Sequence, residues 1–161
     1  MEFVTSLLAR FANPPLHVTD EPGFNARVAG YLWWKRVEIT ELAWRSPYRH
    51  AVLAHEMFHF EHCHSELTLL MFFVSFTASL FCAAAGDWGR LALEACAFVA
   101  CMVAWCWWRE FAADFGAVRA GFGPDLARLY ARQRDSMDSV LSHPIGPARV
   151  AYVNWLARRY G

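Results

Sequence analysis

Residues 53–76 read LAHEMFHFEHCHSELTLLMFFVSF, and this stretch decides how the chain is organised. Its first half carries four histidines and two glutamates, and its second half opens a long apolar run. Two interpretations are open from these residues alone. The polar half is either a metal site or a polar collar where a helix enters a membrane, and the flanking sequence is needed to choose between them.

The apolar half of this stretch begins the first of two long apolar runs. Residues 67–85 are 19 residues without a charged side chain, and residues 91–108 are 18 residues with a single one, Glu94. As helices with a rise of ~1.5 Å per residue, each run covers about 27–29 Å, close to the ~30 Å hydrocarbon core of a bilayer. Only the polar segment GDWGR separates them, so we expect a transmembrane helical hairpin. Two buried core helices of a soluble protein are the alternative, which the small size of the remaining chain disfavours.

The overall composition favours a membrane protein with a polar part attached. The chain has 161 residues, of which 57% are hydrophobic and 19% are charged, below the ~25% charged residues of typical soluble domains. The formal net charge is zero and no polybasic run is present, so we expect no binding to nucleic acid. The five cysteines lack the spacing of a disulfide framework or of a Cys-x-x-Cys metal site.

The charged residues around the hairpin are unevenly distributed. The connecting loop holds Arg90, countered by Asp87, whereas the other side carries many basic residues, among them Lys35, Arg36, Arg45, Arg49, Arg109 and Arg119. Tryptophans fall near both expected interfaces, as in an aromatic belt: Trp88, Trp105, Trp107 and Trp108. Because cytoplasmic segments carry an excess of basic residues, we expect an integral protein of a bacterial inner membrane with both termini and the histidine cluster in the cytoplasm.

The rest of the chain predicts a small sheet and further helices. Strand-like segments are expected over residues 16–20, 26–34 and 36–44. A helix begins at Ser46–Pro47 and runs to about residue 65. Additional helices are expected over residues 1–15, 109–121, 124–137 and 147–160.

The expected fold class is therefore α+β: a mostly helical membrane protein with a small β-sheet and one transmembrane helical hairpin. We expect a single domain over residues 1–161. Residues 1–65 would form the N-terminal helix, the sheet and the histidine-bearing helix, residues 66–108 the hairpin, and residues 109–161 the remaining helices.

The pattern His55-Glu56-Met57-Phe58-His59 is of the H-E-x-x-H type. Positions four apart on a helix lie one above the other, so His55 and His59 can share one Zn²⁺ ion. Glu56 is offset by about 100° and can reach a water on that metal. Since zinc lowers the pKa of such a water toward ~7, a neighbouring carboxylate can take its proton.

A catalytic zinc site needs a third protein ligand, and Glu110 is the strongest candidate. It lies on the helix that returns from the membrane, on the same side as the two histidines. Asp114 follows four residues later on the same helical face and would orient a ligating histidine. A pair of ordinary surface carboxylates is the alternative if the hairpin is disregarded.

The lengths of the two arms predict a break in the first one. From His59 to Gly86 is 27 residues, whereas from Arg90 back to Glu110 is 20. Two straight helices would leave the ligands about 10 Å apart along the hairpin axis, at ~1.5 Å per residue. We therefore expect the histidine-bearing helix to break, tilt or bend around residues 62–66.

Three motifs in this order resemble those of the HtpX-like zinc endopeptidases and the related CAAX prenyl proteases. They are HEMFH before the hairpin, EFAAD after it, and SHPIGPAR near the C-terminus. The upstream segments FNARV and VEITELA are also similar, so the resemblance extends over roughly residues 16–155. Members of this group usually carry further membrane helices before the first motif, so the sequence resembles a minimal version with a zincin-like catalytic domain.

The resemblance implies a role for each matching residue. His55, His59 and Glu110 would bind one Zn²⁺ ion, and Glu56 would be the general base. His143 would stabilise the oxyanion of the tetrahedral intermediate, since a placed donor lowers the barrier to carbonyl attack. Arg149 would pair with Asp114 near the site. The remaining histidines of the cluster, His62 and His64, are expected to form a collar that faces solvent or headgroups.

The resemblance also implies a membrane-anchored zinc endopeptidase that cleaves proteins or peptides at or near the lipid bilayer. We expect the substrate to add a strand at a sheet edge formed by Val37, Glu38, Ile39 and Thr40. Two rival interpretations remain. One is a catalytically inactive membrane protein with a structural or sensory zinc site, and the other is a soluble peptidase with an internal pair of helices.

Overall fold

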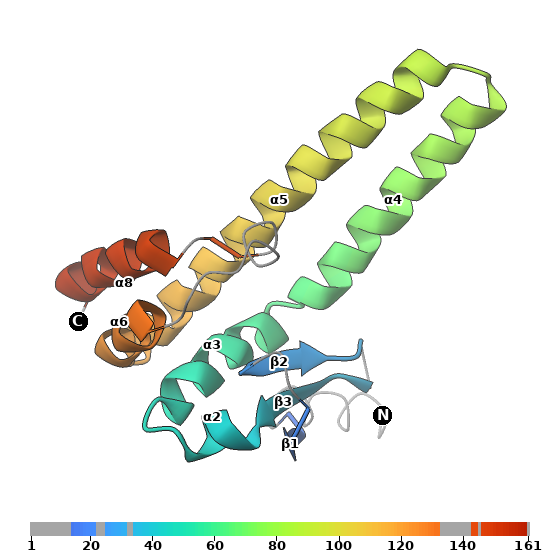
Figure 1. Ribbon diagram of the computed structural model, residues 1–161. Coiled ribbons are helices and arrows are strands. Elements are labelled where there is room, and N and C mark those ends of the chain that lie inside the picture. The colour runs from blue at the N-terminus through green and yellow to red at the C-terminus, as the bar shows by residue number, and fades with distance from the viewer. Residues whose placement is uncertain (1–13, 22–24, 32–33, 133–142, 145, 161) are drawn as a thin grey trace, which may run out of the picture.

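The computed structural model describes residues 14–21, 25–31, 34–132, 143–144 and 146–160. The helix expected over residues 1–15 falls outside these ranges except for its last two residues. Two long antiparallel helices extend from a small body made of a sheet and shorter helices (Figure 1). The described part of the chain is mostly helical, as the sequence predicts, with one three-stranded sheet.

The sheet has the strand order β1-β3-β2. Strand β1 (Leu16–Thr19) pairs in parallel with β3 (Arg36–Thr40), and β2 (Ala26–Ala29) pairs with β3 in antiparallel. The third strand ends earlier than expected because the hydroxyl of Thr40 accepts a hydrogen bond from the backbone N–H of Ala43. This bond caps the short helix α2 (Glu41–Arg45).

The prediction that Val37, Glu38, Ile39 and Thr40 form a substrate-binding edge is wrong. These residues make up most of β3, which is the central strand and pairs with a neighbour on each side. Their side chains are also buried, between 0% and 8% exposed. A central strand has no free backbone groups for an incoming peptide, so these four residues cannot bind one by strand addition.

Helix α3 (Arg49–Glu61) carries the H-E-x-x-H pattern and is followed by a sharp turn at residues 62–63, which we call the elbow. Cys63 adopts the left-handed conformation, with φ 53° and ψ 35°, and helix α4 (His64–Ala84) begins directly after it. The break expected around residues 62–66 is therefore confirmed. A non-glycine residue in this region of backbone space is uncommon and stops α3 from continuing into α4.

A buried lysine ties the two sides of the elbow together. The ammonium of Lys35 donates to the carbonyl of Phe60 at 2.7 Å and to the carboxylate of Glu66 at 2.9 Å. Phe60 lies in the last turn of α3 and Glu66 in the first turn of α4. The side chain of Lys35 is completely buried, so this single charge binds a carbonyl at the end of α3 and a carboxylate at the start of α4, and holds the angle between the helices.

The returning helix α5 (Trp88–Arg119) is much longer than a membrane span requires. It begins after Gly86, which has φ 71°, and the side chain of Asp87 caps its N-terminus. Its 32 residues extend about 48 Å at ~1.5 Å per residue, against ~30 Å for a hydrocarbon core. The apolar part lies beside α4, whereas residues 109–119 reach into the small body (Figure 1).

Helices α6 (Gly123–Arg132) and α8 (Gly146–Tyr160) pack against each other and against the end of α5. Side chains from α3, α5, α6 and α8 pack into one buried core. It consists of Ala51, Ala117, Val118, Leu126, Tyr130, Val153 and Leu156. Gly116 allows α3 and α5 to approach closely, because a Cβ atom there would lie 2.1 Å from the ring of Phe58. This close packing places the H-E-x-x-H helix directly against the helix that carries Glu110 and Asp114.

Candidate metal centre

Three predicted ligands converge on one point between α3 and α5. The Nε2 atoms of His55 and His59 lie 3.2 Å apart. The carboxylate of Glu110 lies 3.3 Å from each of them, through a different oxygen for each histidine. All three side chains are buried. Within the described ranges, no other group of histidine, cysteine or acidic side chains is arranged to hold a metal ion.

The spacing and chemistry of these donors fit zinc. A tetrahedral zinc site with bonds of about 2.0–2.1 Å has ligand atoms about 3.3–3.4 Å apart. The two Nε2 atoms, and each Nε2 atom and its nearer Glu110 oxygen, are separated by close to this spacing, and one ligand atom from each residue lies within 4.8 Å of the others. Two imidazoles and one carboxylate, with a fourth position left open, are the donor set of a catalytic rather than a structural zinc site.

The electrostatics of the centre favour a bound cation. Burial by itself would raise the pKa of Glu110, but hydrogen bonds from His55 and His59 hold it well below its usual range. Burial lowers the pKa of His59 to about 4, so this imidazole stays neutral, as a metal ligand must be. For His55, burial opposes protonation, yet the carboxylates of Asp114 and Glu110 raise its pKa to about 10. Two buried carboxylates thus stabilise positive charge at this point.

Asp114 lies next to the predicted ligand His55, on the side of its ring that faces away from the other ligands. Its Oδ1 atom lies 2.9 Å from Nδ1 of His55, the ring nitrogen that faces away from the other ligands. The carboxylate is completely buried and accepts hydrogen bonds from Arg149 at 2.6 and 2.9 Å and from the hydroxyl of Tyr130 at 2.6 Å. The expected pair between Asp114 and Arg149 is therefore present.

Arg149 connects this supporting group to the ligand set. It comes from the first turn of α8, and its Nη1 atom lies 3.4 Å from the carboxylate of Glu110. The guanidinium also stacks over the ring of Tyr130, 4.0 Å from its centroid. One buried cation therefore faces two buried carboxylates, and it fixes the position of α8 relative to α5.

The two residues with predicted catalytic roles lie next to the ligands. Glu56 is half-buried and follows His55 on α3. Burial raises the pKa of Glu56 to about 7, against the opposing charge of His55, so this carboxylate can exchange protons near neutral pH. His143 precedes α8, and its Nε2 atom lies 3.7 Å from the carboxylate of Glu110. Burial lowers the pKa of His143, which keeps the imidazole neutral and able to donate from one nitrogen.

The structure brings two further residues to the site that the sequence interpretation missed. The sequence predicts only a helix around Tyr130 and no role for its side chain, although a buried tyrosine hydroxyl needs a polar partner. His64 was expected to face solvent or headgroups, and that prediction is wrong. It is 2% exposed, and its Nδ1 atom lies 2.6 Å from Nδ1 of His59. The five-residue spacing was misleading because the elbow at Cys63 turns the chain back, whereas His62 is exposed as expected.

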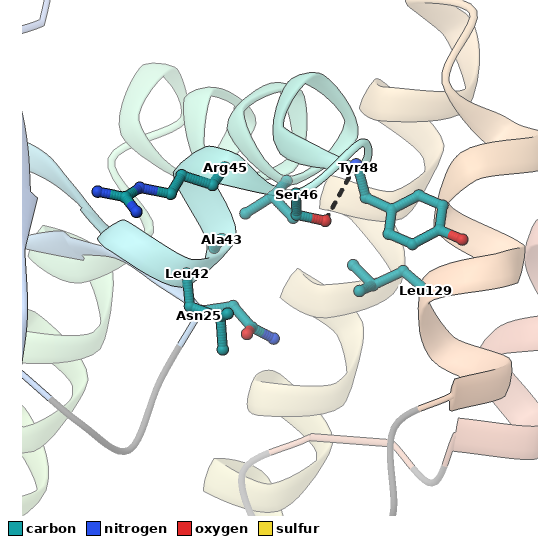
Figure 2. Close-up of a pocket in the computed structure, with 8 residues that line it drawn as sticks. Asn25, Leu42, Ala43, Arg45, Ser46, Tyr48 and Leu129 are labelled. Atoms are coloured by element: carbon teal, nitrogen blue, oxygen red, sulfur yellow. Dashed lines mark hydrogen bonds between the residues drawn. The ribbon is translucent and has the colours of Figure 1, made fainter.

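The apolar cavity shown in Figure 2 is separate from this centre. It has a volume of about 400 Å³ and lies among α2, the start of α3 and α6. Its lining consists of Asn25, Leu42, Ala43, Arg45, Ser46, Tyr48, Val52 and Leu129. None of these residues belongs to the ligand set or to the network around Asp114.

Comparisons with known proteins agree with this geometry. Residues 7–156 match the family model described as peptidase family M48. No curated protein and no solved structure matched the chain. The match covers all three motifs and nearly the whole sequence, and the chain therefore belongs to peptidase family M48, a family of zinc metallopeptidases.

Proposed function

We propose that the protein is a membrane-anchored zinc endopeptidase with its active site at the cytoplasmic end of the helical hairpin. The observation that carries this proposal is the convergence of His55, His59 and Glu110 at 3.2–3.3 Å. Glu56 and His143 flank the same point. Together with membership of family M48, this arrangement supports peptide hydrolysis rather than metal storage or sensing.

Each residue of the site has its own role in the proposed hydrolysis. His55, His59 and Glu110 would hold a zinc ion, which would supply a Lewis acid for the scissile carbonyl and for the attacking water. Glu56 accepts the proton of the attacking water and delivers it to the leaving amine. His143 donates a hydrogen bond to the carbonyl oxygen while negative charge develops there. Asp114 and Arg149 hold His55 and Glu110 in place.

The substrate is proposed to be an extended peptide from a membrane protein or a membrane-proximal segment. The centre lies close to the expected bilayer, because Glu110 follows Trp108 by two residues and α4 begins at His64. Strand β2 lies at one edge of the sheet and contacts α3. Residues 26–29 therefore replace β3 as the proposed site of strand addition.

The two apolar helices support the membrane anchor. In the apolar window of α4 only 6% of residues are buried, and in that of α5 the value is 0%. Core helices of a soluble protein would be mostly buried, so the alternative of an internal pair is disfavoured. The basic residues on the side of the small body support a cytoplasmic orientation.

We expect the full-length protein to remain in the membrane fraction after an alkaline carbonate wash and to enter solution only with detergent. The reason is that two spans of exposed apolar side chains gain a large hydrophobic free energy in lipid. The measurement is immunodetection of the protein in the pellet and supernatant after ultracentrifugation. Release by carbonate without detergent would instead support a soluble peptidase.

Zinc removal is expected to abolish hydrolysis of unfolded casein by the detergent-purified protein, and added zinc is expected to restore it. Zinc content is measured by atomic emission beside the fluorogenic casein assay, before and after 1,10-phenanthroline. His59→Ala is the ligand variant, expected to lose both zinc and activity, and the exposed His62→Ala on the same helix end is its matched control. Activity that survives in zinc-free protein would refute the proposal. A wild-type protein that holds one zinc ion but cleaves no unfolded or membrane substrate would favour the inactive metal-binding protein.

A further inference from the structure

His64 is the first residue of α4 and touches the metal centre from the hairpin side. Its ring is almost fully buried, and its Nδ1 atom lies 2.6 Å from Nδ1 of His59. The Nε2 atom of His59 faces His55 and Glu110 on the opposite side of the ring. His64 therefore contacts the one nitrogen of His59 that is turned away from the ligand set.

The direction of this hydrogen bond follows from the chemistry of imidazole. For Nε2 of His59 to bind a metal, that nitrogen must carry a lone pair, so the proton of the neutral ring lies on Nδ1. Nδ1 of His59 is then the donor, and Nδ1 of His64 is the acceptor. The reverse bond would place the proton of His59 on Nε2 and block the metal.

We propose that His64 is a positioning residue for the metal site, which accepts the Nδ1–H hydrogen bond of His59 and thereby fixes the ring orientation and tautomer that bind zinc. The inference rests on the proposed zinc site but not on its catalytic activity. It assigns to His59 the kind of partner that Asp114 provides for His55. Each histidine ligand then has its own polar partner at Nδ1, one from α5 and one from α4.

The ring of His64 is held in this position by contacts from both long helices. Trp105 and Trp108 of α5 pack edge-on against it, with ring centroids 5.9 and 5.8 Å away. The hydroxyl of Thr68 donates to the carbonyl of His64 at 2.7 Å and accepts from the indole N–H of Trp105 at 2.9 Å. A ring that accepts one hydrogen bond from His59 and packs against Trp105 and Trp108 has little freedom to leave His59.

The elbow explains why a residue five positions after His59 can reach it. On a continuous helix, positions 59 and 64 would be about 140° apart and could not face each other. The left-handed backbone at Cys63 and the bridge from Lys35 to Phe60 and Glu66 turn α4 so that its first side chain points back at α3. The start of the membrane hairpin and the metal ligand are thus physically linked.

The test compares zinc affinity in His64→Leu and His64→Asn with the wild-type full-length protein in detergent. Leucine fills a similar space without an acceptor. Asparagine places its Oδ1 atom on Cγ, the same branching position as Nδ1 of histidine, so it can accept the bond. The zinc dissociation constant is measured by competition with a chromophoric chelator. We expect it to rise about 10- to 100-fold in His64→Leu and to stay within about threefold of wild type in His64→Asn.

The outcomes separate this inference from the proposed function. Wild-type zinc affinity in His64→Leu would overturn it, and so would an equal loss in both variants, because packing alone would then explain the effect. A wild-type protein that binds no zinc would contradict the proposed function itself.

A second measurement needs no substitution. The ¹⁵N chemical shifts of the zinc-loaded wild-type protein report which ring nitrogens carry protons. We expect a protonated Nδ1 on His59 and an unprotonated Nδ1 on His64. A protonated Nδ1 on His64 would overturn the inference even if the leucine variant failed to fold.

Discussion

Replacing Glu56 with glutamine is expected to lower kcat for casein hydrolysis by on the order of 10²–10⁴-fold while leaving one zinc ion bound. The proposed ligand atoms come from His55, His59 and Glu110, so zinc binding is not expected to depend on position 56. Glutamine has nearly the same size as glutamate but cannot accept a proton at neutral pH. Because burial raises the pKa of Glu56 to about 7, the wild-type carboxylate is suited to take a proton and return it.

The matched control for this variant is Glu61→Gln. Glu61 is exposed and ends the same helix, so its replacement removes one negative charge from α3 without touching the centre. We expect the control to retain zinc and wild-type kcat. Both proteins are assayed at equal zinc occupancy, measured by atomic emission. Full activity in a zinc-loaded Glu56→Gln protein would show that another group accepts the proton.

The metal centre was largely predictable from local patterns and from one constraint of length. The i, i+4 spacing places His55 and His59 on one helical face whatever the rest of the fold. A helical hairpin returns the chain to the end from which it started, and this brings Glu110 back to the histidines. The unequal arms, 27 and 20 residues, also required a break near residues 62–66, which the left-handed Cys63 provides.

The features that were missed depend on contacts between distant segments. The order of strands in a sheet is not encoded in any one strand, so the central position of β3 was not apparent from its alternating pattern. The burial of His64 follows from the direction in which α4 leaves the elbow. Lys35 fixes this direction by binding Glu66, although the two residues are 31 positions apart in the sequence. Likewise, the hydroxyl of Tyr130 finds Asp114 only because α6 packs against α5.

Replacing Arg149 with leucine is expected to destabilise the metal-free protein by about 3–5 kcal/mol. The guanidinium is the buried cation that faces the carboxylates of Asp114 and Glu110, at 2.6 and 3.4 Å. Leucine fills part of the space but leaves both carboxylates without this charge partner. The loss is expected to be smaller with zinc bound, because the metal compensates the charge of Glu110. The free energy of unfolding is measured by urea titration in detergent micelles, with and without a chelator.

The control is Arg158→Leu, at an exposed position near the end of α8, which is expected to change the free energy of unfolding by less than about 0.5 kcal/mol. A double variant identifies the mechanism. If the damage arises from an uncompensated charge, adding Asp114→Asn to Arg149→Leu removes one buried carboxylate and recovers part of the lost stability. Losses that simply add would mean that packing, not charge, explains the effect. An Arg149→Leu protein as stable as the Arg158→Leu control would show that the buried carboxylates do not need this cation.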